Sequence, residues 1–409
     1  MWLYNLGISL YAGGIRLAAL WHGKARLWSE GRRNIFERME AAVRPSDRIV
    51  WVHAASLGEF EQARPIIERL RAEHPEYKIL LTFFSPSGYE IRKNYEGADY
   101  VFYLPADTPS NARRFLDIVH PEIAIFIKYE FWINLLSELR RRKVRSYIVS
   151  AIFRRNSVFF RPYGAMWRQA LETFDTLFVQ NVESKRLLSE IGFDNVVVAG
   201  DTRFDRVAQI AAAAQRVETI ERFRGGGRLF VAGSTWGPDE EILLPLVNAN
   251  PDVKFVIAPH EMDEGRIAHL MRNAKGGAVR YTQCDAATRF DDVQVLVLDT
   301  MGMLSSVYGS ATWAYVGGGL GAGIHNTLEA ATFGLPIAFG PNYGKFKEAR
   351  DMVSLGCAVS VRTAGELAAW FAPLCDDEET LRRASRTAKD YTARNQGATG
   401  IILRSIFNS

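Results

Sequence analysis

A polar turn follows the first strongly apolar run of the chain, Ile49–Ala55. Ser56, Gly58 and Glu59 lie in this turn, just before a helical pattern near residues 59–73. A carboxylate at the end of a strand can act as a general base, because it can take a proton from an attacking hydroxyl. The S-x-x-E spacing is equally typical of a capping box at a helix start. Both interpretations of Ser56 and Glu59 stay open at this point.

A second carboxylate, Glu130, follows another predicted strand, Glu122–Ile127, and begins another helical pattern. An acidic residue at a helix start is also favoured by the helix dipole alone. However, the carboxyl ends of parallel strands meet at one edge of a sheet, and ligands bind outside that edge. We therefore expect Glu130 and Glu59 to face the same site, with Lys128 beside them.

In the second half, Gly233-Ser234-Thr235 directly follows the predicted strand Arg228–Ala232. Backbone N–H groups and hydroxyls at a helix start suit a phosphate or an anionic sugar. The alternative interpretation is a plain capped turn.

The most specific motif is the glycine-rich stretch 317–323, which includes Gly318 and Gly319. Glycines after a strand let the backbone approach a ligand closely. Asn326 then opens a predicted helix whose N–H groups would point at a phosphate. Glu329 lies one turn later on the same face, and its two oxygens could accept hydrogen bonds from both ribose hydroxyls. A dinucleotide fingerprint is disfavoured, because Pro336 follows where that motif requires an acidic strand end.

The elements that must position these residues alternate between strands and helices, which predicts parallel sheets covered on both faces. The first series of expected strands is Ile49–Ala55, Lys78–Phe84, Tyr100–Tyr103, Glu122–Ile127, Arg145–Val149, Thr176–Val179 and Val196–Ala199. The second is Arg228–Ala232, Lys254–Ala258, Val279–Tyr281, Val293–Leu298, Thr312–Val316, Pro336–Phe339 and Ala358–Val361. The fold class is therefore α/β, with two Rossmann-like, doubly wound domains that face each other across a cleft.

Four segments follow from this pattern. Residues 1–48 form a membrane-associating segment and lead-in, and residues 49–205 form the first Rossmann-like domain. Residues 206–227 form a linker that ends in three glycines, and residues 228–409 form the second Rossmann-like domain with C-terminal helices.

Composition excludes several classes of protein. A chain of 409 residues with 48% hydrophobic residues is globular and long enough for two domains. Its net charge of +4 is modest, so we expect no nucleic-acid partner. The three cysteines have no metal-type spacing and there is no D-x-D pair, so we expect no metal and no cofactor.

The N-terminus is apolar, aromatic and basic. Residues 2–21 carry two Trp and two Tyr, while Asn5, Arg16 and two adjacent glycines weaken a spanning helix. Basic residues follow from Lys24 to Arg33. This pattern favours a segment that lies in the interface of an anionic membrane, on the cytoplasmic side. A buried first helix is the alternative.

These motifs together resemble the Kdo transferase family of lipopolysaccharide synthesis. The resemblance runs through nearly the whole chain and is carried by the apolar start, Ser56–Glu59, Ser85-Pro86-Ser87-Gly88, Leu104-Pro105-Ala106-Asp107, Glu130-Phe131-Trp132, Asp201–Asp205, Gly233-Ser234-Thr235, His325-Asn326 through Glu329, and Gly340-Pro341 with Phe346. It implies a GT-B fold and an inverting, metal-independent transfer of 3-deoxy-D-manno-octulosonic acid (Kdo). The implied donor is CMP-Kdo, the implied acceptor is a lipid A precursor (lipid IVA), and the implied location is the cytoplasmic face of the inner membrane.

The resemblance also implies roles for individual residues. Glu59 would be the general base, and Glu130 would have an essential supporting role. The implied acceptor site contains Ser56, Gly58 and Lys128. The implied donor site contains Ser234, Thr235, His260, Gly318, Gly319, Asn326 and Glu329.

The sequence departs from the family pattern near His260. The usual Pro-Arg-His is Ala258-Pro259-His260-Glu261 here, and Arg266 or Lys345 is the candidate to replace the arginine. Ala330 stands where a proline usually follows the helix-start glutamate. The alternative functions are a GT-B enzyme that uses a UDP-sugar and a non-catalytic membrane scaffold of the same fold.

Overall fold

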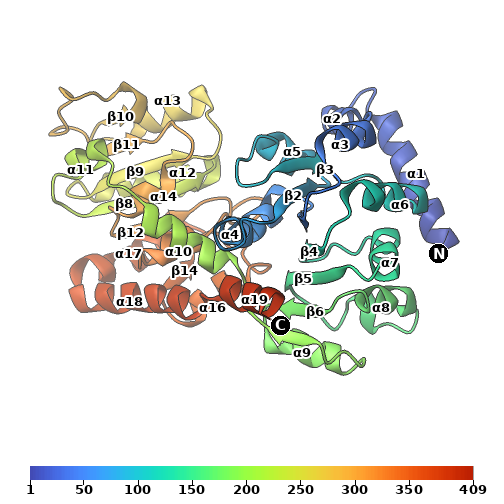
Figure 1. Cartoon of the computed structure of the whole chain (residues 1–409). Helices are drawn as coiled ribbons and strands as arrows, with labels where there is room; N and C mark the ends of the chain where they lie inside the picture. The colour runs from blue at the N-terminus through green and yellow to red at the C-terminus, as the bar shows by residue number, and fades with distance from the viewer. Residues whose placement is uncertain (409) are drawn as a thin grey trace. The chain divides into compact units, whose positions relative to one another are not determined.

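The computed structural model describes residues 1–408 as two compact units, each built on a seven-stranded parallel sheet (Figure 1). Unit 1 comprises residues 1–206 and the C-terminal residues from Gln396, and unit 2 comprises Val207–Asn395. This arrangement confirms the predicted α/β class with two doubly wound sheets.

The sheet of unit 1 has the strand order β3-β2-β1-β4-β5-β6-β7. Its strands are β1 (Ile49–His53), β2 (Lys78–Phe83), β3 (Tyr100–Tyr103), β4 (Ile123–Ile127), β5 (Arg145–Ala151), β6 (Thr176–Val179) and β7 (Val196–Val198). All five residues of β1 and of β4 are buried, as expected for central parallel strands covered on both faces. The order reverses between β1 and β4, and binding sites in such sheets lie outside the strand ends at that point.

The helices of unit 1 cover both faces of this sheet. They are α1 (Trp2–Ala18), α2 (Gly23–Gly31), α3 (Ile35–Ala42), α4 (Leu57–Glu73), α5 (Pro86–Arg92), α6 (Pro109–Val119), α7 (Ile133–Arg141), the 3₁₀ turn η1 (Val158–Phe160), α8 (Ala165–Leu171), α9 (Val182–Ser189) and α19 (Ala398–Phe407). Helix α10 (Arg203–Ala213) leads from unit 1 into unit 2.

The sheet of unit 2 has the order β10-β11-β9-β8-β12-β13-β14 and reverses between β8 and β12. Its strands are β8 (Leu229–Thr235), β9 (Lys254–Pro259), β10 (Ala278–Arg280), β11 (Val295–Val297), β12 (Trp313–Val316), β13 (Ile337–Phe339) and β14 (Ala358–Ser360). Its helices are α11 (Glu218–Arg224), α12 (Gly237–Ala249), α13 (Glu264–Asn273), η2 (Tyr281–Gln283), α14 (Leu304–Tyr308), α15 (Leu328–Thr332), α16 (Lys347–Ser354), α17 (Ala364–Asp376) and α18 (Glu378–Arg394).

The C-terminal helix corrects the predicted boundary at 228–409. Helix α19 belongs to unit 1 and lies beside α4 (Figure 1). Its Ile402 and Ile406 are fully buried in the cluster that contains β1 and α4. The Asp205 carboxylate accepts hydrogen bonds from the Gly397 and Thr399 N–H groups at 2.6 and 2.7 Å, which fixes the start of α19.

The predicted linker 206–227 is likewise not a separate connection. Residues 207–227 cluster with unit 2, where Ile220 and Phe223 of α11 are buried in the core. The amphipathic pattern of α11 requires a core to pack against, and the sequence analysis did not take this into account.

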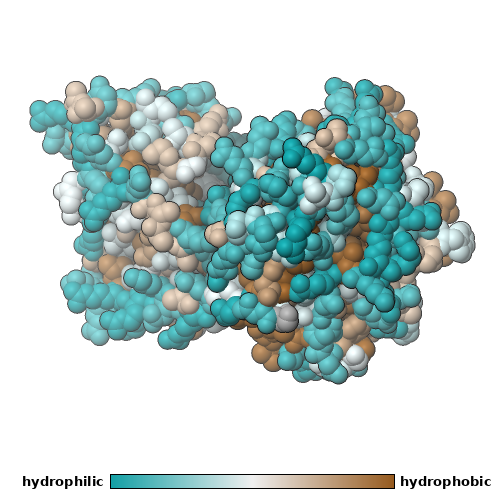
Figure 2. All heavy atoms as spheres, viewed as in Figure 1, coloured by the Kyte–Doolittle hydropathy of each residue, from teal (hydrophilic) through white to brown (hydrophobic). Residues whose placement is uncertain are grey.

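The three N-terminal helices pack onto unit 1, but α1 buries none of its residues. Polar contacts hold it: the Tyr4 hydroxyl donates to Asp107 at 2.6 Å, and the Asn134 amide donates to Asn5 at 2.9 Å. Trp2 is 71% exposed and Leu10 is 67% exposed. In Figure 2, brown atoms gather at the edge of unit 1 where Figure 1 draws α1. Within residues 1–408, no helix is both long enough and apolar enough to cross a membrane.

Candidate functional site

Glu59 lies in the first turn of α4, at the carboxyl end of β1. Its Oε2 accepts a hydrogen bond from the Ala55 N–H at 2.6 Å. Ser56 is the N-cap residue, but its hydroxyl makes no capping hydrogen bond. Of the two side chains of the predicted capping box, only Glu59 accepts a hydrogen bond from the backbone. The Ser56 hydroxyl is available to another partner.

The pKa of Glu59 is raised to about 7. Burial is the largest cause, and the negative charge of Glu130 adds to it. Hydrogen bonds from the Ala55 and Ser56 backbone and the charge of Lys128 act in the opposite direction. The N-terminus of α4 also favours the ionised form, but desolvation and a like charge outweigh it. A base with a pKa near neutrality is well matched to proton transfer at physiological pH.

Gly58 lies inside α4, and a Cβ at this position would meet no atom within 4 Å. The chain therefore does not need glycine here for a tight turn. The open space instead leaves the N-terminus of α4 uncovered. Lys128 follows β4 in the left-handed conformation with φ 57°, which is unfavourable for a side chain of this length. Such strained residues cluster at functional sites.

Glu130 follows β4, which pairs directly with β1, so both carboxylates lie at one edge of the sheet. Its Oε2 accepts a hydrogen bond from Trp132 Nε1 at 2.7 Å and lies 3.1 Å from His53 Nε2. The Glu130 side chain is 12% exposed and His53 is fully buried. Trp132 Nε1 and His53 Nε2 therefore both approach one carboxylate oxygen from inside the protein.

His53 connects the core to Glu130. Trp51 Nε1 can only donate, and it lies 2.8 Å from Thr82 Oγ1. Thr82 Oγ1 also lies 2.9 Å from His53 Nδ1. On the other side of the ring, His53 Nε2 lies 3.1 Å from Glu130 Oε2 and 3.1 Å from Trp132 Nε1. A continuous chain of hydrogen-bonding groups therefore joins Trp51 to Glu130.

In unit 2, the motif Gly233-Ser234-Thr235 forms the end of β8 and does not follow it. The register with β9 shifts between Gly233 and Thr235, and Ser234 at the shift is left-handed with φ 53°. Thr235 is fully buried, and its hydroxyl donates to Glu240 at 3.0 Å. Ser234, which is partly exposed, is therefore the better placed of the two predicted donor contacts.

The glycine-rich loop after β12 packs closely against other backbone segments. A Cβ on Gly319 would lie 2.6 Å from the Gly340 nitrogen, and one on Gly317 would lie 2.2 Å from the Ser234 carbonyl oxygen. Gly318 has φ 88°, and its N–H donates to Asp239 at 2.9 Å. Close approach is thus the reason for these glycines, as expected, but the approaching atoms belong to the chain itself.

Asn326 and Glu329 are held together. The helix that follows the loop, α15, begins at Leu328, two residues later than Asn326, so the prediction that Asn326 opens it is corrected. The Asn326 amide donates to Glu329 Oε1 at 2.9 Å, and the Ser305 hydroxyl donates to Oε2 at 2.8 Å. Both carboxylate oxygens already have a donor, and each retains further lone pairs for a ligand hydroxyl.

Three aromatic rings gather at the carboxyl ends of β8, β9 and β12. The ring centroids of Trp236 and His260 are 4.8 Å apart, and those of His260 and His325 are 4.3 Å apart. Trp236 Nε1 donates to His325 Nε2 at 3.1 Å, which places the His325 proton on Nδ1. Burial and the neighbouring His260 lower the pKa of His325, so this ring is neutral at physiological pH.

The two candidates for the missing arginine differ in their contacts. Arg266 donates to the buried Glu240 at 2.7 Å and to the Thr235 carbonyl, so it is committed to an ion pair. Lys345 is exposed. Among residues 1–408, no three His, Cys, Asp or Glu side chains form a group that could hold a metal ion.

Sequence reasoning missed four residues that organise these sites: His53, Thr82, Ser305 and Asp239. His53 had a visible signal, since it is the polar last residue of an otherwise apolar strand. Asp239 accepts hydrogen bonds from Tyr315, Gly318 and Trp236, whereas the sequence presented it only as one of three acids in a helix start. Long-range partners of this kind leave no pattern in a single sequence.

Solved structures share the two-unit fold. UDP-GlcNAc 2-epimerase from Neisseria meningitidis, bound to UDP-GlcNAc, matches 88% of this chain and 100% of its own with a TM-score of 0.63 and 15% identity. MurG from Acinetobacter baumannii matches 89% of this chain and 100% of its own with a TM-score of 0.55 and 13% identity. At these identities the likeness establishes the fold alone, which is that of GT-B proteins.

Closer relatives cover most of the sequence. The 3-deoxy-D-manno-octulosonic acid transferase of Haemophilus influenzae is 26% identical over 378 residues, which are 88% of this chain and 86% of the relative. The enzyme of that name from Bordetella pertussis is 28% identical over 373 residues, covering 87% and 86%. The one from Aquifex aeolicus is 26% identical over 328 residues, covering 78% and 83%.

A family model described as 3-deoxy-D-manno-octulosonic-acid transferase matches residues 32–206, the greater part of unit 1, which contains Glu59 and Glu130. The relatives extend the similarity through unit 2. Over most of its length, the chain is therefore similar to 3-deoxy-D-manno-octulosonic-acid (Kdo) transferases.

Proposed function

We propose that this protein is an inverting glycosyltransferase that moves Kdo from CMP-Kdo to a hydroxyl of a lipid A precursor. Similarity to the family supports Kdo transfer, and the structural observation that carries the proposal is the Glu59 carboxylate, held by the Ala55 N–H at the carboxyl end of β1 on the same sheet edge as Glu130. A sugar hydroxyl is a poor nucleophile and must lose its proton as the new bond forms, so a base is required there, and the raised pKa of Glu59 suits this role.

In the proposed reaction, the acceptor oxygen attacks the anomeric carbon of Kdo while Glu59 takes the hydroxyl proton. The bond between that carbon and the CMP phosphate oxygen breaks, and CMP leaves with the electron pair as a phosphate anion. Glu130, which contacts His53 and Trp132, raises the pKa of Glu59 through its negative charge. Glu130 is thus a positioning residue in this proposal, and Glu59 is the catalytic base.

The donor is assigned to unit 2 in this proposal. Glu329 would accept hydrogen bonds from the ribose hydroxyls of CMP, and Ser234 with the loop 318–319 would meet the phosphate and the sugar. The paired donors on Glu329, from Asn326 and Ser305, support this role because they fix the carboxylate in one orientation. Lys345 is the exposed cation that we assign to the carboxylate or phosphate of the donor.

The acceptor and the membrane are assigned to unit 1. Ser56 and Lys128 flank Glu59 at the sheet edge, and the open space over Gly58 leaves room for a bulky ligand. The exposed apolar side chains of α1 would lie in the bilayer interface, on the cytoplasmic face of the inner membrane.

The decisive experiment measures transfer directly. CMP-Kdo generated in situ is supplied with a tetraacylated lipid A precursor, and the product is followed by mass. Kdo addition by the wild-type chain, lost in Glu59→Gln and retained in Glu96→Gln, supports the proposal, since Glu96 is an exposed carboxylate of the same unit. No addition by the wild-type chain would reject it.

Donor identity is tested separately by calorimetry with CMP and with UDP-GlcNAc. We expect CMP to bind and Glu329→Ala to weaken it by about 1–3 kcal/mol through unpaired ribose hydroxyls. Binding of UDP-GlcNAc in preference to CMP would favour the UDP-sugar alternative.

A further inference from the structure

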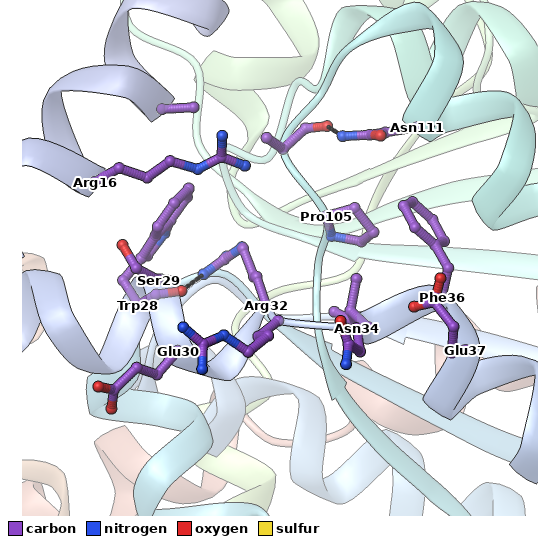
Figure 3. A pocket seen from close by; sticks show the side chains of 14 residues that line it. Arg16, Trp28, Ser29, Glu30, Arg32, Asn34, Phe36, Glu37, Pro105 and Asn111 are labelled. Carbon is purple, nitrogen blue, oxygen red and sulfur yellow. Dashed lines mark hydrogen bonds between the residues drawn. The ribbon is translucent and has the colours of Figure 1, made fainter.

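A pocket of about 570 Å³ lies in unit 1 at the junction of α1, α2 and α3. Its walls come from α1, from the segment that joins α2 to α3, and from the loop after β3 (Figure 3). Figure 3 shows Arg16 reaching across from α1 toward the pocket, with Trp28, Ser29 and Arg32 along one side. The pocket is separate from the sheet edge that carries Glu59 and Glu130, because none of the residues of that edge lines it.

The pocket has an excess of cations that the chain does not neutralise. Arg16 and Arg33 are exposed, and neither guanidinium has a hydrogen-bond or ion-pair partner within residues 1–408. Of the two lining carboxylates, Glu37 is engaged by Arg114 at 3.2 Å. The Glu30 carboxylate is turned away from Arg16 (Figure 3). Two free arginines at one pocket favour an anionic ligand.

A third arginine in the pocket wall, Arg32, is partly buried and has no carboxylate partner among the described residues. Arg32 donates to the carbonyl oxygens of Leu104, Trp28 and Phe84 at 2.8, 3.1 and 2.8 Å. Burial lowers its pKa to about 9, and no carboxylate opposes this effect. All of its partners in the chain are neutral, so its positive charge adds to that of Arg16 and Arg33.

Two polar atoms of the pocket wall also lack partners. Trp28 is 6% exposed, and its indole N–H has no acceptor within the described chain. The Ser29 hydroxyl is buried and unpaired in the same way. Unpaired buried donors are unfavourable unless a ligand or solvent supplies an acceptor. A ligand with several acceptor oxygens would meet this need together with the arginines.

The position of the pocket beside α1 indicates where such a ligand comes from. Arg16 and Ala12 line the pocket from the same helix that exposes Leu6, Leu10 and Leu17. A ligand with an anionic head in the pocket could therefore place apolar chains along α1 without crossing any other element.

We propose that this pocket binds the phosphate monoester of a membrane lipid, with Arg16 and Arg33 as its charged ligands. An arginine guanidinium can donate two parallel hydrogen bonds to two oxygens of one phosphate. A phosphate monoester has more free oxygens for such bonds than a diester has. The inference deepens the proposed function, under which the bound lipid would be the phosphorylated acceptor.

The test compares vesicles at equal ionic strength. The full chain is bound to phosphatidylcholine vesicles that contain either phosphatidic acid, a monoester, or phosphatidylglycerol, a diester. We expect the wild-type chain to prefer phosphatidic acid by about tenfold. Arg16→Gln with Arg33→Gln should abolish this preference. The matched control, Arg161→Gln with Lys185→Gln, removes two exposed cations of unit 1 outside the pocket and should keep it.

The outcomes separate the alternatives. An equal loss of binding to both lipids, with the preference unchanged, would mean general surface electrostatics and would overturn the site. Full displacement from phosphatidic acid vesicles by inorganic phosphate, but not by sulfate, would assign the pocket to free phosphate and overturn the lipid assignment. The comparison needs no donor and no turnover, so a lost preference in the double variant supports the pocket even if the transfer assay fails. A retained preference rejects the pocket even if that assay succeeds.

Discussion

Glu59 is the residue whose chemistry depends most on its surroundings. Its carboxyl group is buried beside Glu130, and its pKa of about 7 stands well above the ordinary value of 4.5. The folded protein therefore holds this proton between about pH 4.5 and 7, whereas the unfolded chain does not. The resulting contribution to stability is present below pH 4.5 and is lost as the pH rises to about 7. At neutral pH the base that catalysis needs thus destabilises the fold.

The first prediction concerns Glu59→Gln. The amide keeps the shape and the acceptor for the Ala55 N–H, but it removes the base and the repulsion from Glu130. Turnover should fall by roughly 10²–10⁴. The free energy of unfolding at pH 8 should rise by about 2 kcal/mol. Single-turnover kinetics and denaturant unfolding measure the two effects, and a variant with near-normal turnover would return Glu59 to a purely structural role.

The second prediction concerns the pH dependence of the reaction. The base works only when deprotonated, so kcat/KM should rise with pH and level off above about 7. Glu130→Gln removes the like charge, so the pKa of Glu59 should fall and the rise should move to lower pH. The pH at which kcat/KM rises can be measured even if the variant is slow. If this pH is the same in the variant and the wild type, burial alone sets the pKa of Glu59.

The third prediction concerns the hydrogen bonds that connect Glu130 to the core through His53 and Thr82. Thr82→Val removes the hydroxyl that joins Trp51 to His53, and leaves Trp51 Nε1 buried without its acceptor. Stability should fall by about 1–3 kcal/mol. The Thr82 carbonyl oxygen, 3.2 Å from His53 Nδ1, would then be the partner left to that nitrogen from residue 82, so the tautomer with its proton on Nδ1 should be favoured. Nitrogen chemical shifts of the imidazole report the tautomer, and Thr82→Ser, which keeps the hydroxyl, should behave like the wild type.

At the scale of elements, the strands were the most predictable part of the molecule. Runs such as Ile49–Val52 and Ile123–Ile127 are apolar throughout because both faces of a central parallel strand are buried, and this pattern is local. Helix starts were less predictable. Helix α15 begins at Leu328 and has only five residues, since the preceding loop is held by contacts with Asp239 and Gly340, both distant in sequence.

The candidate sites were predictable to a similar degree. Glu59, Glu130 and Glu329 could be located because acidic residues at strand ends and helix starts form local patterns. Their electrostatics could not, because the pKa of Glu59 depends on burial and on a residue 71 positions away. The ion pair of Arg266 with Glu240 likewise joins residues from two helices, α12 and α13, and only the fold brings them together.

The fourth prediction concerns the two glycine loops of unit 2. Gly319→Ala would place a Cβ 2.6 Å from the Gly340 nitrogen, so one of the two backbones must move. We expect a lower melting temperature and a weaker response to CMP. Gly344→Ala is the matched control, because a Cβ there meets no atom within 4 Å. Calorimetric melting with and without CMP measures both effects, and equal behaviour of the two variants would mean that the loops adapt freely.

At the scale of the whole molecule, the fifth prediction concerns the N-terminus. Removal of residues 1–22 deletes an apolar helix with no buried residue, so binding to anionic liposomes should weaken while unit 1 stays folded. Loss of the Tyr4 contact leaves Asp107 with the N–H donors of Asn134 and Leu135. Flotation assays measure binding, and circular dichroism measures folding. A truncated chain that unfolds would place this segment in the core.

Helix α19 follows unit 2 in the sequence but packs in unit 1, and this has a consequence for biosynthesis. The ribosome completes β1 and α4 early, but the helix that covers them is made only after unit 2. During synthesis of unit 2, the apolar surface that later receives Ile402 and Ile406 stays uncovered. Apolar surface that is exposed in this way makes a nascent chain prone to aggregation. Premature termination shortly before residue 396 would release a product whose second half is complete and whose first half is not.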